Sequence, residues 1–427
     1  MAPGTGAPPG SGESGRGPTG SGLPGGRSSG ARPSGGRSFG EAAYAEPGPT
    51  GAGPAETGLV DHHCHSVVTD ELDDSTLTGF FTESDRPPAS GTSPLDSALG
   101  LAVRRWCPPA LGLPAHAPAA DYLARRRELG APEAARRLFA AAGLDTCLLD
   151  TGLASAAGRP LLPPAEFAAL SGAYVREVVR LERIAESLAA LGPGAAGWPS
   201  AVREAVGAAV EGGAVALKSV LAYRHGLDIP AERPTGAEVV RAAGEWLGGS
   251  GHQRLTDPVL LRHLLWTALD ACAERRLPIQ LHTGFGDPDL TLHRADPSLL
   301  TAFIRAAEPT GVPLVLLHGY PYHRQAGWLA HAFPHVYTDL GLTASYTGPQ
   351  VAAVLGEMLE LVPFGKLLFS TDGYGLPELH LVGAAQFRHG LGVLLSSWRG
   401  DGACSAADAD RIGELIAAGN ARTLYRI

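Results

Sequence analysis

Short apolar runs alternate regularly with longer stretches of helical periodicity from residue 58 to the end of the chain. This alternation is typical of repeated strand–helix units around a parallel sheet. Apolar runs without polar interruption, such as Val315, Leu316 and Leu317, suit strands that are buried on both faces. Eight such runs are present, which is the number of strands that closes a (β/α)8 barrel. We therefore predict an α/β fold of the TIM-barrel type.

The eight predicted strands differ in how clearly the pattern defines them. The third is the least clear, because residues 174–191 would also suit one continuous helix. In chain order, the predicted strands are residues 58–63, 144–150, 177–181, 214–219, 278–283, 313–318, 335–340 and 366–371.

Three segments lie outside the strand–helix repeat. Residues 1–57 are rich in Gly, Pro and Ser and poor in large apolar side chains, so we predict a disordered tail before one catalytic domain of residues 58–427. Residues 66–143 form an insertion after the first strand, with helical pieces at 97–106 and 120–142. Because a loop after a barrel strand emerges at the catalytic face, we expect the insertion to cap the substrate. Residues 406–425 read as an amphipathic helix that closes the barrel.

Charge and cysteine content restrict the partners of the chain. The net charge of −9 falls on residues 58–427, because four Arg balance four Glu in the tail, and no basic run is present. This favours a small-molecule substrate over nucleic acid or an anionic membrane. No apolar run approaches a membrane span, and five scattered cysteines fit reduced thiols. We expect a soluble cytoplasmic protein, and association into a homo-oligomer is left open.

Potential metal ligands stand at the ends of several predicted strands. His63 and His65 are two residues apart on the first strand, so they project to the same side, about 7 Å apart. His282, His318 and Asp372 end three later strands. The carboxyl ends of all barrel strands meet at one mouth, and imidazoles with one carboxylate form a usual catalytic site for zinc or a similar divalent ion.

These residues also have a purely structural interpretation. A histidine pair two residues apart is by itself a weak signal and could be hydrogen-bonded inside the core, and the same holds for His318 alone. Packing does not readily explain the whole set at matching strand ends. The metal-site hypothesis is therefore the one that we carry forward.

With these residues in place, the chain resembles the amidohydrolase superfamily, in its amidohydrolase-related (type 2) branch, from residue 58 to the end. It is similar within that branch to the amidohydrolase domains fused to glutamine synthetase-like modules. The motifs that carry this closer resemblance are Ala-Leu-Lys-Ser at 216–219, Leu-His-Thr-Gly-Phe-Gly-Asp at 281–287, His-Gly-Tyr-Pro-Tyr-His-Arg at 318–324 and Ser-Thr-Asp-Gly at 370–373.

The resemblance implies a divalent metal, zinc above manganese or iron, on His63, His65, His282 and Asp372. The metal would activate water, Asp372 would accept the water proton and pass it to the leaving amine, and His318 would polarise the carbonyl or bind a second metal. In relatives with two metals, a lysine at the position of Lys218 forms a bridging carbamate. Lys218 would otherwise contact the substrate or pair with Asp372 or Glu182.

Several other residues are candidates for substrate binding. Arg324 and Tyr322 could hold a carboxylate, and Asp287 and Glu378 could meet an ammonium group. The alternative for each candidate is an ordinary loop or surface ion pair. Further candidates at the strand ends are Glu182, Arg180 and Arg224.

The function predicted from the sequence is hydrolysis of a C–N bond in a small amide, with a γ-glutamyl amide as one substrate class. Non-oxidative decarboxylation on the same barrel is the alternative reaction, and release of carbon dioxide in place of an amine would identify it. An alternative of another class is a non-catalytic, metal-binding partner protein. A substituted set of metal ligands would favour that alternative, and the sequence has none.

Overall fold

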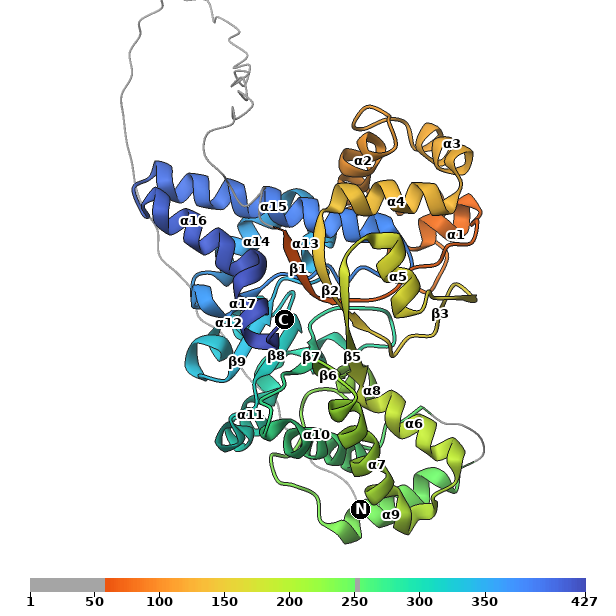
Figure 1. Ribbon diagram of the computed structural model, residues 1–427, viewed down its shortest axis with the longest axis vertical. Helices are drawn as coiled ribbons and strands as arrows, with labels where there is room; N and C mark the ends of the chain where they lie inside the picture. Colours follow the sequence, from red (N-terminus) through yellow and green to blue (C-terminus); the bar gives the residue numbers. More distant parts are fainter. Residues whose placement is uncertain (1–57, 250–253) are drawn as a thin grey trace, which may run out of the picture. The chain divides into compact units, whose positions relative to one another are not determined.

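Eight parallel strands form one sheet in the computed structural model, which describes residues 58–249 and 254–427 (Figure 1). The strands pair in chain order, and each lies at a predicted position. The predicted tail falls outside the described residues. The strands are β1 (Leu59–Cys64), β2 (Leu144–Asp150), β5 (Tyr174–Arg180), β6 (Ala216–Ser219), β7 (Ile279–Thr283), β8 (Leu314–His318), β9 (Val336–Asp339) and β10 (Leu367–Leu368).

The sheet closes on itself between its first and last strands. His62 N donates to Phe369 O at 3.2 Å, and Asp372 N donates to His63 O at 3.1 Å, so the segment after β10 continues the ladder along β1. The predicted (β/α)8 barrel is therefore confirmed. Closure leaves no free sheet edge, and it brings the carboxyl ends of all eight strands to one mouth.

The third strand is a strand and not the start of a long helix. β5 is rich in β-branched residues and pairs on both sides, with β2 and with β6. The helix begins only at the next residue, as α6 (Leu181–Leu191). The alternative of one continuous helix over 174–191 is therefore wrong.

The end of the barrel opposite the mouth is closed by the C-terminal segment. α16 (Ala406–Glu414), a π-helical turn at Leu415–Gly419 and α17 (Asn420–Tyr425) follow one another without a break, as predicted for residues 406–425. Leu424 and Tyr425 pack against the inward-facing side chains of the strands, including Val60 and Leu148. This small apolar cluster fills the barrel below the mouth.

The remaining helices surround the barrel (Figure 1). Among the described residues, no helix is both long enough and apolar enough to cross a bilayer. A short antiparallel hairpin pairs β3 (Ser155–Ala156) with β4 (Arg159–Pro160). The helices are α5 (Pro164–Ser171), α7 (Gly194–Glu211), α8 (Leu221–Arg224), α9 (Gly236–Leu247), α10 (Pro258–Ala273), α11 (Thr301–Ala307), α12 (His323–Ala332), α13 (Thr343–Tyr346), α14 (Val351–Met358) and α15 (Pro377–Gly400).

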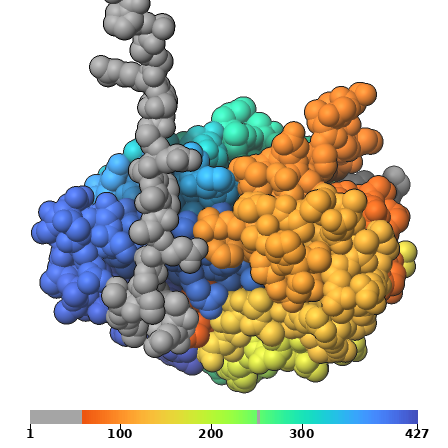
Figure 2. Space-filling view, turned by 90° about the horizontal axis from the view of Figure 1, so that it is seen from above, coloured from red at the N-terminus to blue at the C-terminus, as the bar shows by residue number. Residues whose placement is uncertain are grey.

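The insertion after β1 folds into four helices, α1 (Asp74–Gly79), α2 (Ala98–Ala110), α3 (Ala119–Leu129) and α4 (Ala131–Ala142). One helix was predicted for residues 120–142, but Gly130 adopts a φ of 77° and divides it into α3 and α4. Only glycine adopts this backbone conformation at little cost. α2 and α4 pack on α15, and Figure 2 shows the insertion, in orange, beside the C-terminal helices, in blue.

Candidate active site

A cavity of about 1320 Å³ opens at the carboxyl ends of the strands. His65, Lys218, His282 and Asp372 line it from the barrel. The insertion contributes a wall that includes Glu83, so its predicted position over the mouth is confirmed. His63 and His318 are fully buried beside this cavity.

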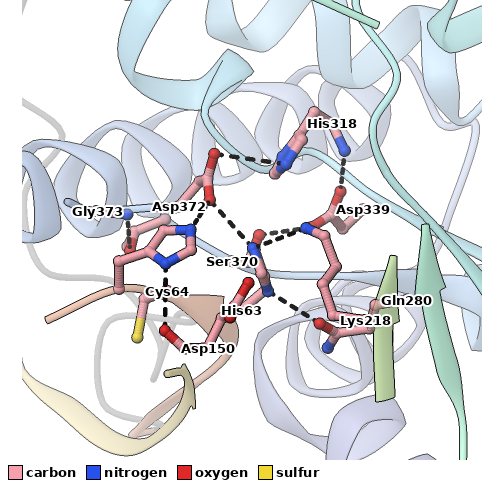
Figure 3. A network of polar contacts seen from close by, with 12 residues as sticks. His63, Cys64, Asp150, Lys218, Gln280, His318, Asp339, Ser370, Asp372 and Gly373 are labelled. Atoms are coloured by element: carbon pink, nitrogen blue, oxygen red, sulfur yellow. Dashed lines mark hydrogen bonds and ion pairs between the residues drawn. The ribbon is translucent and has the colours of Figure 1, made fainter. Parts of the chain in front are cut away.

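Asp372 lies at the centre of the histidine cluster (Figure 3). Its Oδ1 is 3.2 Å from His63 Nε2 and 3.4 Å from His65 Nε2, and its Oδ2 is 3.4 Å from His318 Nε2. Two atoms bound to one tetrahedral ion at about 2.1 Å are separated by about 3.4 Å. The donor atoms of His63, His65 and Asp372 therefore have the spacing of ligands around a single metal ion.

Hydrogen bonds fix which nitrogen of His63 faces Asp372. Gln280 Nε2 donates to His62 O at 2.8 Å and to Tyr425 Oη at 2.9 Å, which orients its amide. Gln280 Oε1 then accepts from His63 Nδ1 at 2.9 Å (Figure 3). The proton of the neutral ring is on Nδ1, so His63 Nε2 presents a lone pair to the site.

His65 is oriented in the same way, because its Nδ1 donates to Asp150 O at 3.3 Å. Burial lowers the pKa of His63 to about 3, so its ring is neutral. Burial raises the pKa of Asp372, but opposing electrostatic interactions, of which the one with His318 is the largest, hold it well below its usual range. Because Nδ1 of each ring is engaged in a hydrogen bond, Nε2 of His63 and Nε2 of His65 face the Asp372 carboxylate, and a cation between these groups would relieve their repulsion.

His282 and His318 extend the cluster on its other side. Their ring centroids are 4.8 Å apart, and burial lowers the pKa of both. His282 Nε2 is buried and has no hydrogen-bond partner among the described residues, and neither have the two ring nitrogens of His318. His282 is not part of the tight group of His63, His65 and Asp372. It could complete that group around one ion or, with His318, bind a second.

The backbone at His318 and Asp372 is strained. Their φ values are 69° and 50°, in the left-handed region that non-glycine residues rarely adopt. Asp339 Oδ1 accepts from His318 N at 2.6 Å, and Thr371 N donates to Asp61 Oδ1 at 2.9 Å, so buried carboxylates hold both turns. Strain of this kind is concentrated at functional sites.

Lys218 lies inside the cluster, with only 1% of its surface exposed. Its Nζ is 3.1 Å from His63 Nε2, and it lines the cavity as predicted. Burial lowers the pKa of Lys218 to about 8, against the opposing effect of the nearby carboxylates of Asp150 and Asp372. No ion pair joins Lys218 to Asp372 or Glu182 in the described part of the chain. Its amine is thus available to a metal or to a substrate.

Only part of the predicted substrate-binding set reaches the cavity. Asp287 lines it from the loop after β7. Arg180 and Arg224 also line it, although each already pairs with an acidic residue, Asp150 at 2.6 Å and Glu186 at 3.1 Å.

Four predicted substrate contacts lie elsewhere. Arg324 is exposed on α12 and donates to Glu360, and Tyr322 precedes that helix without lining the cavity. Glu182 is buried, where it accepts from Ser219 Oγ and Val220 N. Glu378 accepts from Arg126 at 2.6 Å and from Tyr122 at 2.9 Å, which ties α3 to α15. The geometry corrects these predictions, because Arg324, Glu182 and Glu378 have other partners, and Tyr322, which is half-buried, does not line the cavity.

Other cavity residues were missed from the sequence. The Tyr223 ring is 4.4 Å from the His282 ring, and Glu83, Tyr346 and Arg183 line the same space. Tyr223 follows the end of β6 closely, and this position in the sequence could have predicted that it lies at the mouth of the barrel. Glu83 lies in the irregular part of the insertion, where no local pattern shows which side chain will face the barrel.

Removing the hydrogen bond to His63 tests the orientation of this ligand. We expect Gln280→Leu to weaken metal binding by about 10- to 100-fold, because His63 Nδ1 loses its acceptor while the volume of the side chain is nearly kept. Competition with a chelator measures the change. Gln386→Leu is the matched control, since Gln386 is buried on α15, away from the histidine cluster, and accepts a hydrogen bond from Trp106 Nε1. Equal metal affinity in both variants would show that the hydrogen bond from His63 Nδ1 to Gln280 does not contribute to metal binding.

The fold and the site together define a class: a (β/α)8 barrel with histidines and an aspartate gathered at the strand ends is the architecture of metal-dependent hydrolases. Residues 60–427 match the amidohydrolase family, and the chain belongs to that family. The family prediction made from the motifs is therefore confirmed.

Individual relatives agree with this assignment. Over 223 residues, half of this chain, the sequence is 33% identical to the protein fluG of Emericella nidulans, of whose length the match spans 26%. A Lactobacillus casei protein described as a metal-dependent hydrolase superposes with a TM-score of 0.76 and 27% identity, over 87% of this chain and 96% of its own. Uronate isomerase of Thermotoga maritima shares the fold, with a TM-score of 0.60 and 14% identity over 87% and 95% of the two chains.

Proposed function

We propose that this protein is a metal-dependent amidohydrolase that cleaves the C–N bond of a small amide, with γ-glutamyl amides as the substrate class. One observation carries the proposal. His63 Nε2, His65 Nε2 and Asp372 Oδ1 converge at ligand spacing beside a deep cavity, and each imidazole is held with its lone pair toward the others. The similarity to amidohydrolase domains fused to glutamine synthetase-like modules supports the glutamyl part.

The residues fit a divalent metal, with zinc favoured over manganese or iron because three or four nitrogen and oxygen donors surround one point. When bound, such an ion acts as a Lewis acid and makes water nucleophilic at neutral pH. His63, His65 and Asp372 would hold it, and His282, whose buried Nε2 has no hydrogen-bond partner in the part of the chain that the structure describes, would complete the set.

Side chains of the protein transfer the proton and stabilise the carbonyl oxygen. Asp372 accepts a proton from the attacking water as the new C–O bond forms, because its carboxylate is ionised and faces the ligand group. The C–N bond then breaks, and Asp372 returns the proton to the leaving nitrogen. His318, buried beside Asp372, is placed to steady the carbonyl oxygen as negative charge develops.

The proposal also covers the binding partner of the protein and its location in the cell. A small molecule is the expected partner, since the chain is mildly acidic and the cavity is deep, and neither nucleic acid nor a membrane is required. We also propose a cytoplasmic location, because all five cysteines are unpaired thiols and four of them are buried.

A product assay tests the reaction. Purified protein loaded with zinc or manganese is given a panel of γ-glutamyl and simple amides and, separately, aromatic carboxylic acids. The proposal predicts release of ammonia or amine from the amides in amounts equal to the free acid formed. Release of carbon dioxide from the carboxylic acids would establish the decarboxylase alternative. No turnover of either panel by metal-loaded protein would contradict an amidohydrolase of this substrate class.

A further inference from the structure

One wall of the cavity combines carboxylates with aromatic rings next to His282. Glu83 from the insertion and Asp287 from the loop after β7 both line the main cavity and a smaller adjoining cavity of about 450 Å³. Tyr346 also lines both cavities, and Tyr223 lines the main cavity with its ring 4.4 Å from the His282 ring. We call Glu83, Asp287, Tyr223 and Tyr346 the acidic subsite.

The two carboxylates of the acidic subsite lack cationic partners. No arginine or lysine forms an ion pair with Glu83 or Asp287 among the described residues, although arginines line the same cavity. Three of these arginines pair with other carboxylates: Arg180 with Asp150, Arg224 with Glu186 and Arg254 with Asp289. Within the described part of the chain, neither Glu83 nor Asp287 therefore has a basic side chain in direct ion-pair contact.

The local electrostatics agree with this arrangement. Burial raises the pKa of Glu83 to about 7, against a hydrogen bond from Tyr346, and the negative charges of Asp372 and Asp287 add to the rise. A cation placed between Glu83 and Asp287 would remove this penalty and restore the ionised carboxylate.

The aromatic residues add a second attraction for a cation. The Phe285 and Tyr346 rings lie 5.3 Å apart, and the Tyr374 ring lies against Phe80 at 5.4 Å. Aromatic faces attract ammonium groups, most strongly where water is excluded. Carboxylates and aromatic rings together are a usual environment for an organic ammonium, whereas a bare metal ion would require more oxygen ligands.

We propose that the acidic subsite binds an ammonium group of the substrate, so that the enzyme prefers amides that carry a positive charge near the scissile bond. The inference rests on the proposed amidohydrolase function, which supplies the scissile bond next to His282 and Asp372. The ammonium could belong to the acyl part, as in an α-amino group, or to the far end of the leaving amine. Both sources present the same chemistry to Glu83 and Asp287.

Two matched pairs of substrates separate the sources. The first pair is the γ-glutamyl amide of 1,4-diaminobutane and that of n-pentylamine, which differ only in an ammonium against a methyl group on the amine side. The second pair is the γ-glutamyl and the glutaryl amide of n-pentylamine, which differ only in the α-ammonium. We expect a preference of about 10- to 100-fold in kcat/KM for the charged member of at least one pair.

The Glu83→Gln variant assigns that preference to the subsite. It should reduce the preference to within a fewfold of unity, mainly by raising KM of the charged member. Glu360→Gln is the matched control, because Glu360 is exposed and pairs with Arg324 away from the cavity. The control should keep the wild-type preference.

Three outcomes overturn the inference while the proposed function stands. They are amide hydrolysis with no preference in either pair, a preference for the neutral members, and a preference that survives in both Glu83→Gln and Asp287→Asn. If no amide is hydrolysed, the proposed function fails separately, and calorimetric binding of 1,4-diaminobutane, of glutamate and of n-pentylamine to metal-loaded protein still tests the subsite. Binding of an ammonium compound that Glu83→Gln weakens about tenfold supports it, and binding that Glu83→Gln leaves unchanged contradicts it.

Discussion

Asp372→Asn is expected to reduce kcat/KM by about 10²- to 10⁴-fold and to lower the metal content of the purified protein. Asp372 supplies the only carboxylate of the tight ligand group, and it also faces His318. Asparagine keeps the shape, but it is a weaker ligand and cannot accept the proton of the attacking water. Steady-state kinetics on an amide found in the product assay, with metal analysis of the same sample, measures both effects.

Asp145→Asn is the matched control for this experiment. Asp145 is on β2 near its start, at the end of the barrel opposite the mouth, and pairs with Arg422 on the surface. It should retain metal and activity within about twofold, since exposed ion pairs contribute little. A fully active, metal-loaded Asp372→Asn variant would remove Asp372 from both the ligand set and the chemistry.

Lys218→Arg is expected to reduce activity by at least about 100-fold although the positive charge is kept. The amine is buried against His63 Nε2, where a planar and larger guanidinium does not fit without displacing the imidazole. Arginine also stays protonated, so it can neither form a bridging carbamate nor supply a compact, titratable amine. Activity and metal content of the variant are measured together.

The changes in metal content and in activity together identify the role of Lys218. Loss of about one metal per chain, with partial recovery when short-chain carboxylates are added to Lys218→Ala, would indicate a carbamate bridge. Loss of activity with full metal content would place the amine against the substrate. Near-normal activity of Lys218→Arg would show that any cation suffices at this position.

The barrel could be predicted from the sequence because its signals are local. An apolar run followed by a histidine or an aspartate marks both a buried strand and the position of its last side chain. The topology then requires His63, His282 and Asp372 to meet, since all strand ends of a closed parallel barrel share one mouth. Predicting that these residues meet did not require the conformation of any loop.

The substrate-facing residues could not be predicted in this way. Arg324 lies two residues into α12, and the direction in which that helix begins turns its side chain toward Glu360 and solvent. Glu378 was predicted to bind an ammonium group of the substrate, but its carboxylate accepts a hydrogen bond from Arg126 of the insertion. Contacts between an irregular insertion and the barrel depend on how distant segments pack, which periodicity does not encode. For the same reason, Glu83 gave no signal at all.

The central claim is that His63, His65 and Asp372 bind a catalytic metal ion. Anomalous diffraction at the zinc absorption edge, from crystals of zinc-loaded protein, tests it without any assumption about the substrate. We predict a peak about 2.0 to 2.3 Å from His63 Nε2, His65 Nε2 and an oxygen of Asp372, with His282 or Lys218 next to it. Zinc-loaded crystals with no peak between these three residues, or with a peak only at another position, would contradict the account.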